Sequence, residues 1–576
     1  MQRKTVLLTV LAIIVSSVMV ITSACSKSTT TTTTTSAAVT TTTTTTTTNS
    51  TPQVITLNLG GENNTIDPNR ASWTSERTII IQCFDGLLTF NPDLTLAPMV
   101  ASAIPTVANG GISADGKTYT ISLRHDVTWS DGTKVTAKDF AFSIKRIFDP
   151  DLAGEYASFY FNIVGGSDYY GAATKTTAEK QALLDAIGVK ALDDYTLQIQ
   201  LTDALPTFTQ LLALWPSYPI RQDMVDAHGD NWAQPDTNGA MPYYIGNGPF
   251  ILKEWVQQDH YTLVRNDKYW GTKPQLTQIT FKEIADPNTA LAAYKNNELD
   301  QTGVPAGTEK ATMADPVQAA ELIRVPQLTT FGLQFNVTKA PFDNKLVRQA
   351  LSCAIDRAAY VDQVRAGVGK VALSWIPPGM PGYDATLGTD WAFNPDKAKQ
   401  LLAQAGYPNG QGLPELKFEY ASTGTNPTLA AFLQAQLKTN LGINLTLEPM
   451  ESKAFSALVN AKQFNWAWYG WGADYPDPDD WLPQIFGTGA GNNKTGYSSA
   501  QFDAISVQAL KELDNTKRLQ LWAQAQSIVV ADAPMVFLWN RETFVLQKSW
   551  VKGMVTSGLD GTTVGDTFLR NVYIQK

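Results

Sequence analysis

Four aspartates near the end of the chain form a group whose spacing could hold a metal ion: Asp474, Asp477, Asp479 and Asp480. Carboxylate oxygens are the ligands that calcium prefers, and EF-hand loops present them at short intervals. This segment lacks the central glycine and the terminal glutamate of such a loop, and Pro476 and Pro478 stiffen its backbone. We therefore expect these carboxylates to serve a purpose other than calcium binding.

Other groups that carry out chemistry are scarce. The three histidines, His125, His228 and His260, are far apart in sequence from one another and from the cysteines, which disfavours a zinc or nickel site built on imidazole. The chain has no G-x-S-x-G elbow, no G-x-x-x-x-G-K-[ST] phosphate loop, no H-E-x-x-H and no G-x-G-x-x-G. We expect neither an enzyme nor a cofactor.

The start of the chain is typical of a secretory leader. A basic beginning, Gln2–Lys4, precedes an apolar stretch over Val6–Ile21, and small residues stand directly before Cys25. The apolar stretch is short, so a cleaved leader is favoured over a membrane-spanning helix. Ser-Ala-Cys resembles a bacterial lipobox, although Thr22 stands where Leu, Val or Ile is usual. We expect residues 1–25 to be a lipoprotein signal peptide with a lipid on Cys25; cleavage without lipidation is the alternative.

A threonine-rich segment follows, over residues 26–52. It has no apolar periodicity and cannot build a core, so we expect a disordered tether. Its extended length is at most roughly 90 Å, at ~3.3–3.6 Å per residue. A lipid, a tether and a large folded body predict a protein held at the outer face of a cell membrane, in the periplasm or outside the cell.

Composition bounds the folded body, residues 53–576. This length predicts two or three lobes rather than one core. A content of 43% hydrophobic and 17% charged residues is typical of a globular protein, and the net charge of −9 argues against a nucleic-acid partner. Beyond Cys25, the chain has only Cys83 and Cys353, which could form a disulfide but are more typical of buried free thiols.

Helix and strand signals alternate along the body and predict an α/β fold. Apolar alternation predicts strands at 54–59, 118–123, 196–201, 261–265 and 278–283. Asp115-Gly116 and Asp131-Gly132 are typical hairpin turns. Thr136, with Asp139 three positions later, predicts the start of a helix that reaches Pro150.

The second half of the body continues the alternation. Asn394-Pro395 predicts a helix start, and Gly406 with Pro408 predicts its end. Strands are expected at 416–420 and 443–447, on either side of a helix over about 427–440.

Several of these segments together carry a resemblance to a known family. The block Ala114–Phe140, ADGKTYTISLRHDVTWSDGTKVTAKDF, closely resembles the signature of family 5 extracellular solute-binding proteins, the dipeptide and oligopeptide receptors of ABC importers. Further segments resemble other marks of the family in the same order: Phe84–Leu88, Gly246–Phe250, Arg265–Trp270, Ala340–Arg357 and Gly470–Pro478.

The resemblance implies a periplasmic-binding-protein-like fold with two main α/β lobes joined by a hinge, plus an inserted third lobe. Lobe I would hold 53–96, 218–326 and 541–576, lobe II 97–217, and lobe III 327–540. The ligand would lie between lobes I and III, which close about hinge strands near 326 and 540.

The resemblance also implies a peptide site. Main-chain pairing is expected from Asp85, Gly86 and Leu87 on lobe I and from Gly470, Trp471 and Gly472 on lobe III. An enclosed α-amine needs a counter-charge, and relatives that bind peptides place an aspartate where this chain has Asp474. The alternative for Asp474 is a cap on the turn before Pro476, and Trp471 is the expected aromatic wall.

Some positions depart from the family pattern. Trp468 stands where some oligopeptide receptors carry a basic group for the ligand carboxylate, and it adds aromatic surface to the predicted pocket. Lys494, beside Asn492 and Asn493, is a candidate replacement. Tyr156 resembles a ligand-facing tyrosine of lobe II. Arg348 and Arg357 are expected to be structural and paired with acids.

The resemblance therefore predicts a monomeric oligopeptide receptor that binds its ligand, closes around it and delivers it to the permease subunits of an ABC importer. The main alternative keeps the fold and the transport role but binds an oligosaccharide, a metal chelate, haem or another small molecule. A secreted hydrolase would need a nucleophile and a base that the sequence does not show. A surface adhesin on the threonine-rich tether is a further alternative.

Overall fold

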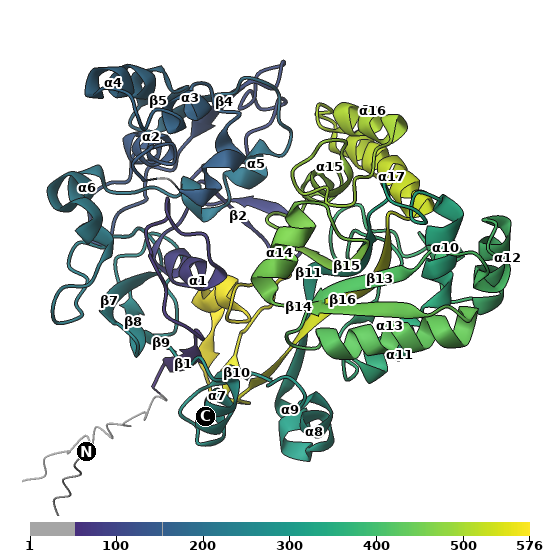
Figure 1. The fold of residues 1–576 in the computed structure, drawn as a ribbon. Helices are drawn as coiled ribbons and strands as arrows, with labels where there is room; N and C mark the ends of the chain where they lie inside the picture. Colours follow the sequence, from purple (N-terminus) through teal and green to yellow (C-terminus); the bar gives the residue numbers. More distant parts are fainter. Residues whose placement is uncertain (1–51, 153) are drawn as a thin grey trace, which may run out of the picture. The chain divides into compact units, whose positions relative to one another are not determined.

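The computed structural model describes residues 52–576 with the exception of residue 153. The predicted leader, Cys25 and nearly all of the predicted tether lie outside the described residues. Within the part of the chain that is described, no helix combines the length and the apolar character needed to cross a membrane. Helices and strands are mixed throughout this part, which confirms the α/β prediction (Figure 1).

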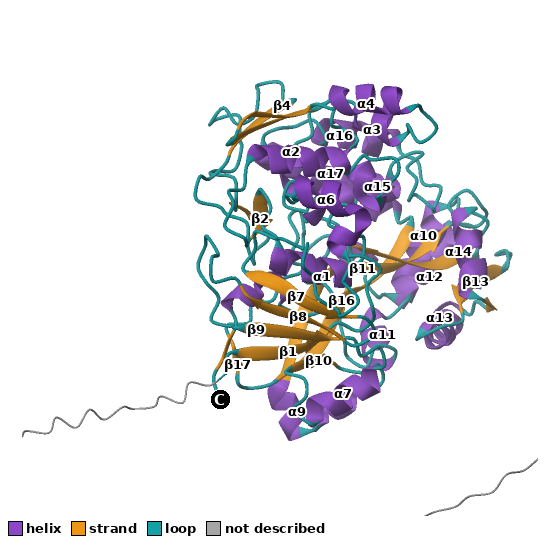
Figure 2. Ribbon diagram, turned by 90° about the vertical axis from the view of Figure 1, so that its left-hand side faces the viewer, coloured by secondary structure: helices purple, strands orange, loops and turns teal. Residues whose placement is uncertain are grey.

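A four-stranded sheet is formed by the first strand of the body and three strands from the middle of the chain (Figure 2). Its order is β1 (Val54–Asn58), β9 (Gln278–Lys282), β8 (His260–Arg265) and β7 (Phe250–Val256). β1 is parallel to β9, and the other neighbours are antiparallel. The three strands predicted here from apolar alternation are confirmed.

A three-stranded antiparallel sheet follows the order β4 (Thr118–Ser122), β6 (Thr196–Gln200) and β5 (Val189–Asp193). Helix α2 (Ala137–Arg146) begins as the sequence predicts. The Asp139 carboxylate accepts a hydrogen bond of 2.7 Å from the Thr136 N–H, which closes the capping box at the first turn.

A seven-stranded sheet organises the second half of the chain. Along its main path the order is β10 (Gln301–Gly303), β16 (Met535–Gln547), β11 (Leu322–Phe335), β15 (Trp466–Gly472), β13 (Leu416–Ala421) and β14 (Leu445–Met450), and β12 (Lys370–Val371) also pairs with β16. The long strands β11 and β16 are antiparallel, and their register shifts between Pro326 and Thr330. Both predicted crossing points, near 326 and 540, lie within this pair; the lobe boundaries themselves stay a prediction.

Helices and short strands complete the described chain. The α-helices besides α2 are α1 (Thr74–Cys83), α3 (Gly166–Tyr170), α4 (Thr177–Ala186), α5 (Phe208–Leu211), α6 (Gln222–His228), α7 (Pro287–Lys295), α8 (Glu309–Ala314), α9 (Pro316–Glu321), α10 (Lys345–Ala354), α11 (Arg357–Gln363), α12 (Pro395–Gln404), α13 (Asn426–Leu441), α14 (Ser452–Asn460), α15 (Pro483–Phe486), α16 (Ala500–Ala509) and α17 (Asn515–Asp532). The short pairs are β2 (Leu88–Phe90) with β3 (Leu96–Pro98), and β17 (Val551–Lys552) with β18 (Tyr573–Ile574).

Seven short 3₁₀ helices also occur in the described residues: η1 (Glu155–Tyr160), η2 (Trp215–Ser217), η3 (Gly229–Ala233), η4 (Thr389–Trp391), η5 (Pro408–Gly410), η6 (Pro478–Asp480) and η7 (Asp566–Asn571). Two predicted helix starts are confirmed in detail. Asn394 caps α12 by accepting a hydrogen bond from the Lys397 N–H, and Asn426–Leu441 forms the helix expected between β13 and β14.

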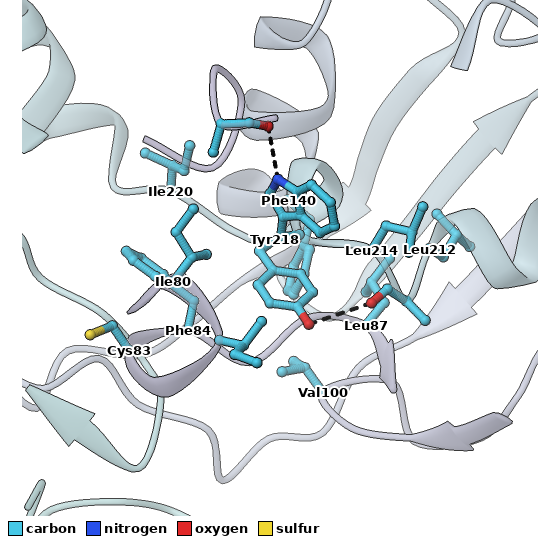
Figure 3. Close-up of a cluster of buried hydrophobic side chains, with 14 of the residues drawn as sticks. Ile80, Cys83, Phe84, Leu87, Val100, Phe140, Leu212, Leu214, Tyr218 and Ile220 are labelled. Carbon is cyan, nitrogen blue, oxygen red and sulfur yellow. Dashed lines mark hydrogen bonds between the residues drawn. The ribbon is translucent and has the colours of Figure 1, made fainter. Parts of the chain in front are cut away.

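The hydrophobic cores follow the sheets. The largest runs from Ile55 to Phe281 and also includes residues near the C-terminus, such as Ile574, so the predicted lobes I and II share one continuous core. Figure 3 shows part of this core, in which Tyr218 lies among Phe84, Leu87 and Val100. Two further cores occupy the region from Leu328 to Trp539.

The two cysteines of the folded body and the arginines Arg348 and Arg357 are buried. Cys83 and Cys353 are buried free thiols, so the disulfide alternative is wrong. Arg348 and Arg357 are structural as expected, but the guanidinium groups donate to backbone carbonyls, including those of Asp532 and Phe537, instead of pairing with carboxylates. Neither arginine forms an ion pair in the described structure, so the expected pairing with acids is wrong.

Candidate functional site

A cavity of about 580 Å³ is lined by residues that are far apart in the sequence. Asp85 follows α1, Tyr156 lies in η1, Gly472 and Asp474 come from the end of β15, and Arg541 lies in β16. Ligand pockets commonly measure ~300–1,000 Å³, so this cavity is large enough for a ligand. It brings together four of the predicted site residues.

Asp474 is a half-buried carboxylate at the wall of this cavity. The Tyr156 hydroxyl donates a long hydrogen bond, 3.5 Å, to Asp474 Oδ1. The backbone N–H of Asp474 donates to Asp480 Oδ2 at 3.0 Å. No cation pairs with Asp474 among the residues that the structure describes. Burial raises the pKa of Asp474 to about 6, and the contact with Tyr156 offsets part of this shift. A desolvated carboxylate without a counter-charge is suited to receive a cation from a ligand.

The other three aspartates of the cluster each have a separate partner. Asp477 forms a buried bidentate pair with Arg518, with both distances at 2.6 Å. Asp479 accepts a hydrogen bond from Thr207 at 2.9 Å, and burial together with the charge of Asp477 raises its pKa to about 8. Asp480 accepts the hydrogen bond from the Asp474 N–H, and burial raises its pKa. The described residues contain no group of His, Cys, Asp or Glu placed to hold a metal ion.

β15 presents main-chain groups next to Asp474. β11 pairs with this strand along its whole length, whereas β13 pairs with it only at Trp466 and Ala467. The stretch 468–472 therefore has a strand neighbour on one side only in the described structure. Gly472 lines the cavity at the end of this open edge. An extended ligand could add a strand here, because an unpaired edge carries free N–H and C=O groups.

The two residues before Gly472, Gly470 and Trp471, do not line the cavity. Gly470 has a packing requirement of its own, since a Cβ at this position would lie 2.2 Å from the ring of Phe331. Trp471 packs at the edge of the core that contains Trp375 and Trp481. The roles of Gly470 and Trp471 in ligand binding stay predictions.

The predicted lobe I segment, 85–87, already forms an ion pair and hydrogen bonds within the chain. The Asp85 carboxylate pairs with Arg570 at 2.9 Å and accepts a hydrogen bond from Tyr269 at 2.7 Å. The carbonyl oxygens of Gly86 and Leu87 accept hydrogen bonds from backbone N–H groups at 3.0–3.1 Å. Of these three predicted residues only Asp85 lines the cavity, and ligand pairing by the segment stays a prediction.

The remaining predicted residues lie outside the cavity. Trp468 stacks on Phe331 with ring centroids 5.0 Å apart. The buried amide of Asn493 donates to the carbonyl groups of Gly487 and Tyr497, which fixes its own loop. The Asn492 carbonyl accepts a hydrogen bond from the Lys494 N–H, and the Lys494 ammonium donates to the Gly491 carbonyl at 2.8 Å. Ligand contacts by Trp468, Asn492 and Asn493 stay predictions.

The cavity also contains residues that sequence reasoning missed. Gln327, Leu328 and Thr329 come from the register shift of β11, and Arg541 comes from β16. Residues 557–562 reach the cavity from the returning C-terminal segment. No local pattern in the sequence marks these residues. Pairing between β11 and β16 brings 327–329 and Arg541 together at the wall, and 557–562 lie there because of the course of the C-terminal segment.

The comparisons with known proteins agree with this architecture. The family model of bacterial extracellular solute-binding proteins, family 5, middle region, matches residues 95–493. The chain is 31% identical over 530 residues to the periplasmic oligopeptide-binding protein OppA of Escherichia coli strain K12, covering 91% of this chain and 93% of that protein. It is 30% identical to the probable deoxycholate-binding periplasmic protein YgiS of the same strain, covering 87% of this chain and 90% of that protein. The chain belongs to family 5 of the bacterial extracellular solute-binding proteins.

A solved structure confirms the predicted fold class. The unliganded open form of the periplasmic murein tripeptide-binding protein MppA is similar to this chain with a TM-score of 0.78 and 27% sequence identity. The match covers 91% of this chain and 98% of that structure. The fold is thus periplasmic-binding-protein-like, with two main α/β lobes joined by a hinge and a further inserted lobe.

Proposed function

We propose that this protein is the extracytoplasmic substrate-binding receptor of an ABC importer, and that it binds oligopeptides between two closing lobes and delivers them to a membrane permease. The family and the peptide-binding relatives support this function. The observation that carries it furthest is Asp474, a carboxylate at the cavity wall that has no cation partner among the described residues. In this function the protein carries out no catalysis.

The α-amine of a peptide would supply the missing cation. Asp474 follows the open edge of β15 by two residues, so a peptide whose amine meets this carboxylate could pair its backbone with the stretch 468–472. Such pairing reads no side chains and is suited to peptides of mixed sequence. Tyr156, which contacts Asp474, would stay beside the bound amine.

A non-peptide ligand is the second candidate. The YgiS relative is named for deoxycholate, and the cavity wall includes apolar and aromatic side chains such as Phe84, Phe90 and Trp215. An apolar ligand would be held by these rings, and it would not depend on the charge of Asp474.

Native mass spectrometry of the purified full chain, followed by denaturation and analysis of what is released, tests the proposal. A ladder of short peptides of mixed sequence is the expected result. The Asp474→Ala variant should retain little of that ladder. A single non-peptide mass, or a melting temperature that does not respond to added peptides, would overturn the peptide function and favour the second candidate.

The site of action is part of the proposal. We infer that residues 1–25 form a leader, that Cys25 carries a lipid and that the protein acts as a monomer at the outer face of the membrane. The intact mass of membrane-associated protein should show the loss of residues 1–24 and the gain of a lipid. In the Cys25→Ser variant the lipid mass should be absent; an unmodified Cys25 in the wild-type protein would contradict this.

A further inference from the structure

A second acid, Asp560, lies at the wall of the same cavity as Asp474. It is buried, with 8% of its surface exposed. Its Oδ2 accepts hydrogen bonds of 2.8 Å from the backbone N–H groups of Ser557 and Gly565. Its Oδ1 has no hydrogen-bond partner among the described residues. Because a buried polar atom without a partner is costly, this oxygen calls for a donor from outside the described chain.

The charge of Asp560 is not balanced within the chain. Arg77 is close enough to act on this charge, but it forms an ion pair with Asp566 at 3.3 Å. Asp566 also accepts a hydrogen bond from the Gly561 N–H at 3.1 Å, so this second acid is well satisfied. Asp560 itself forms no ion pair with any residue that the structure describes. Two carboxylates and one guanidinium therefore leave an excess of negative charge at this part of the cavity.

The surroundings of Asp560 suit a long basic side chain. The hydroxyls of Thr74 and Thr562 lie 3.0 Å apart, and both residues line the cavity. An ammonium has three donors, so these hydroxyls could accept those that Asp560 does not. Leu328 and Leu559 line the same cavity and offer apolar surface to a methylene stem.

Leu328 contacts both segments that carry the two acids. The Ala473 N–H donates to the Leu328 carbonyl at 2.9 Å, and a Cβ at Gly558 would lie 2.8 Å from Leu328 Cγ. Asp474 follows Ala473 directly, and Asp560 follows Gly558 by two residues. A ligand whose α-amine meets Asp474 therefore occupies the cavity that Asp560 borders, and only a side chain of that ligand has to reach Asp560.

We propose that Asp560 binds the lysine or arginine side chain of a bound peptide and makes the cavity prefer a basic residue at one position of its ligand. This role rests on the proposed peptide function. It differs from the role of Asp474, because the α-amine is common to all peptides whereas Asp560 would read a side chain. The peptides released from the purified protein should accordingly be enriched in lysine and arginine.

Proton release gives this role a second signature. Burial, followed by the charge of Asp566, raises the pKa of Asp560 to about 7, and the two backbone N–H groups and Arg77 offset part of the shift. Without ligand, Asp560 is therefore about half protonated at pH 7. A cationic side chain would displace this proton, and an uncharged side chain of the same length would not.

Calorimetry on the purified full chain tests the preference. The alanine peptide of two to five residues that binds best serves as host, and each alanine is replaced in turn by lysine and by norleucine, which has a similar length and no charge. In the wild-type protein we expect lysine to bind ~10–100-fold more tightly than norleucine at one position, the range for a charge-assisted hydrogen bond. In Asp560→Asn, lysine and norleucine should bind equally at that position.

A control variant and a second measurement keep the result interpretable. Asp226→Asn removes an exposed acid on α6 outside the cavity and should retain the preference for lysine. Titrations of the wild-type protein at pH 7, in buffers of different ionisation enthalpy, count the protons released. The lysine peptide should release about half a proton more than the norleucine peptide. This comparison also decides the case if Asp560→Asn does not fold.

The possible failures are distinct. The same preference for lysine in the wild-type protein and in folded Asp560→Asn would overturn the role of Asp560, and a lower melting temperature of that variant would then assign the carboxylate to its own turn. Alanine peptides that bind, with no preference for lysine at any position and no difference in proton release, would overturn the role while leaving the peptide function intact. If no peptide binds the wild-type protein, the peptide function fails, and the role of Asp560 fails with it.

Discussion

Replacing Asp474 by asparagine should separate ligand binding from stability. Asp474 has no cation of its own in the described structure, so the change removes a charge that only the ligand would neutralise. A hydrogen bond between charged groups contributes ~1.5–3 kcal/mol, and loss of one partner from a fully buried pair costs ~3–5 kcal/mol. Asp474 is half-buried, so we expect a loss of ~2–4 kcal/mol, or ~30–1,000-fold in Kd.

The unliganded protein should respond in the opposite direction. Burial raises the pKa of Asp474 to about 6, above the ordinary value of an aspartate. The charged form therefore costs stability above pH 6, and this cost declines as the pH falls from about 6 towards the ordinary value of an aspartate, about 4. Asp474→Asn removes the cost, so without ligand the variant should melt at or above the wild-type temperature at pH 7.5.

Affinity should also depend on pH with a defined sign. In the unliganded protein Asp474 is mostly protonated at pH 5, and a proton must leave before an ammonium can pair with it. We expect wild-type Kd for an alanine peptide to be weaker by about tenfold at pH 5 than at pH 7.5, following a pKa of about 6. Asp474→Asn should lose most of this dependence.

Isothermal titration calorimetry and thermal melting measure both effects. The matched control is Asp226→Asn, which removes an exposed carboxylate on α6 away from the cavity. It should leave Kd, its pH dependence and the melting temperature unchanged. A folded Asp474→Asn protein with wild-type affinity and a lower melting temperature would refute the reasoning and support a turn-capping role before Pro476.

Two further predictions concern stability and are measured by urea denaturation. Gly470→Ala should lower the free energy of unfolding by ~1–3 kcal/mol, because the added Cβ would lie 2.2 Å from the Phe331 ring. Gly472→Ala should lower it less, since its Cβ would lie 3.3 Å from Thr329 Oγ1. Equal denaturation midpoints for the two variants would contradict the packing explanation. Asp477→Asn breaks the buried pair with Arg518 and should cost ~3–5 kcal/mol; a loss below that of Gly470→Ala would show that the pair contributes little.

Local elements were predictable because their signals are local. The capping box at Thr136 and Asp139 and the cap at Asn394 each depend on residues three positions apart, and the structure contains both. Apolar alternation identified strands such as 118–123 for the same reason. Family resemblance extended this to the fold class and placed Asp474 at the cavity.

The rest of the site depends on contacts between distant segments. Arg541 reaches the cavity because β16 pairs with β11 with a shifted register. No sequence pattern near residue 541 predicts this pairing. Lys494 is close in sequence to plausible ligand residues, yet its loop bonds to itself. Trp468 and Gly470 illustrate the same difficulty. Both pack against Phe331, and nothing in the sequence indicates that Phe331 lies beside them.

The return of the C-terminus to the first core has a consequence for the time course of folding. The Gln53 side chain donates a hydrogen bond to the Ile574 carbonyl, 521 positions later in the chain, and Asp85 pairs with Arg570. The core that begins at Ile55 is therefore complete only after the last residues have been synthesised. Contacts of such long sequence separation slow folding. A nascent chain therefore remains without its finished N-terminal core throughout translation, which would keep it unfolded for export by the proposed leader.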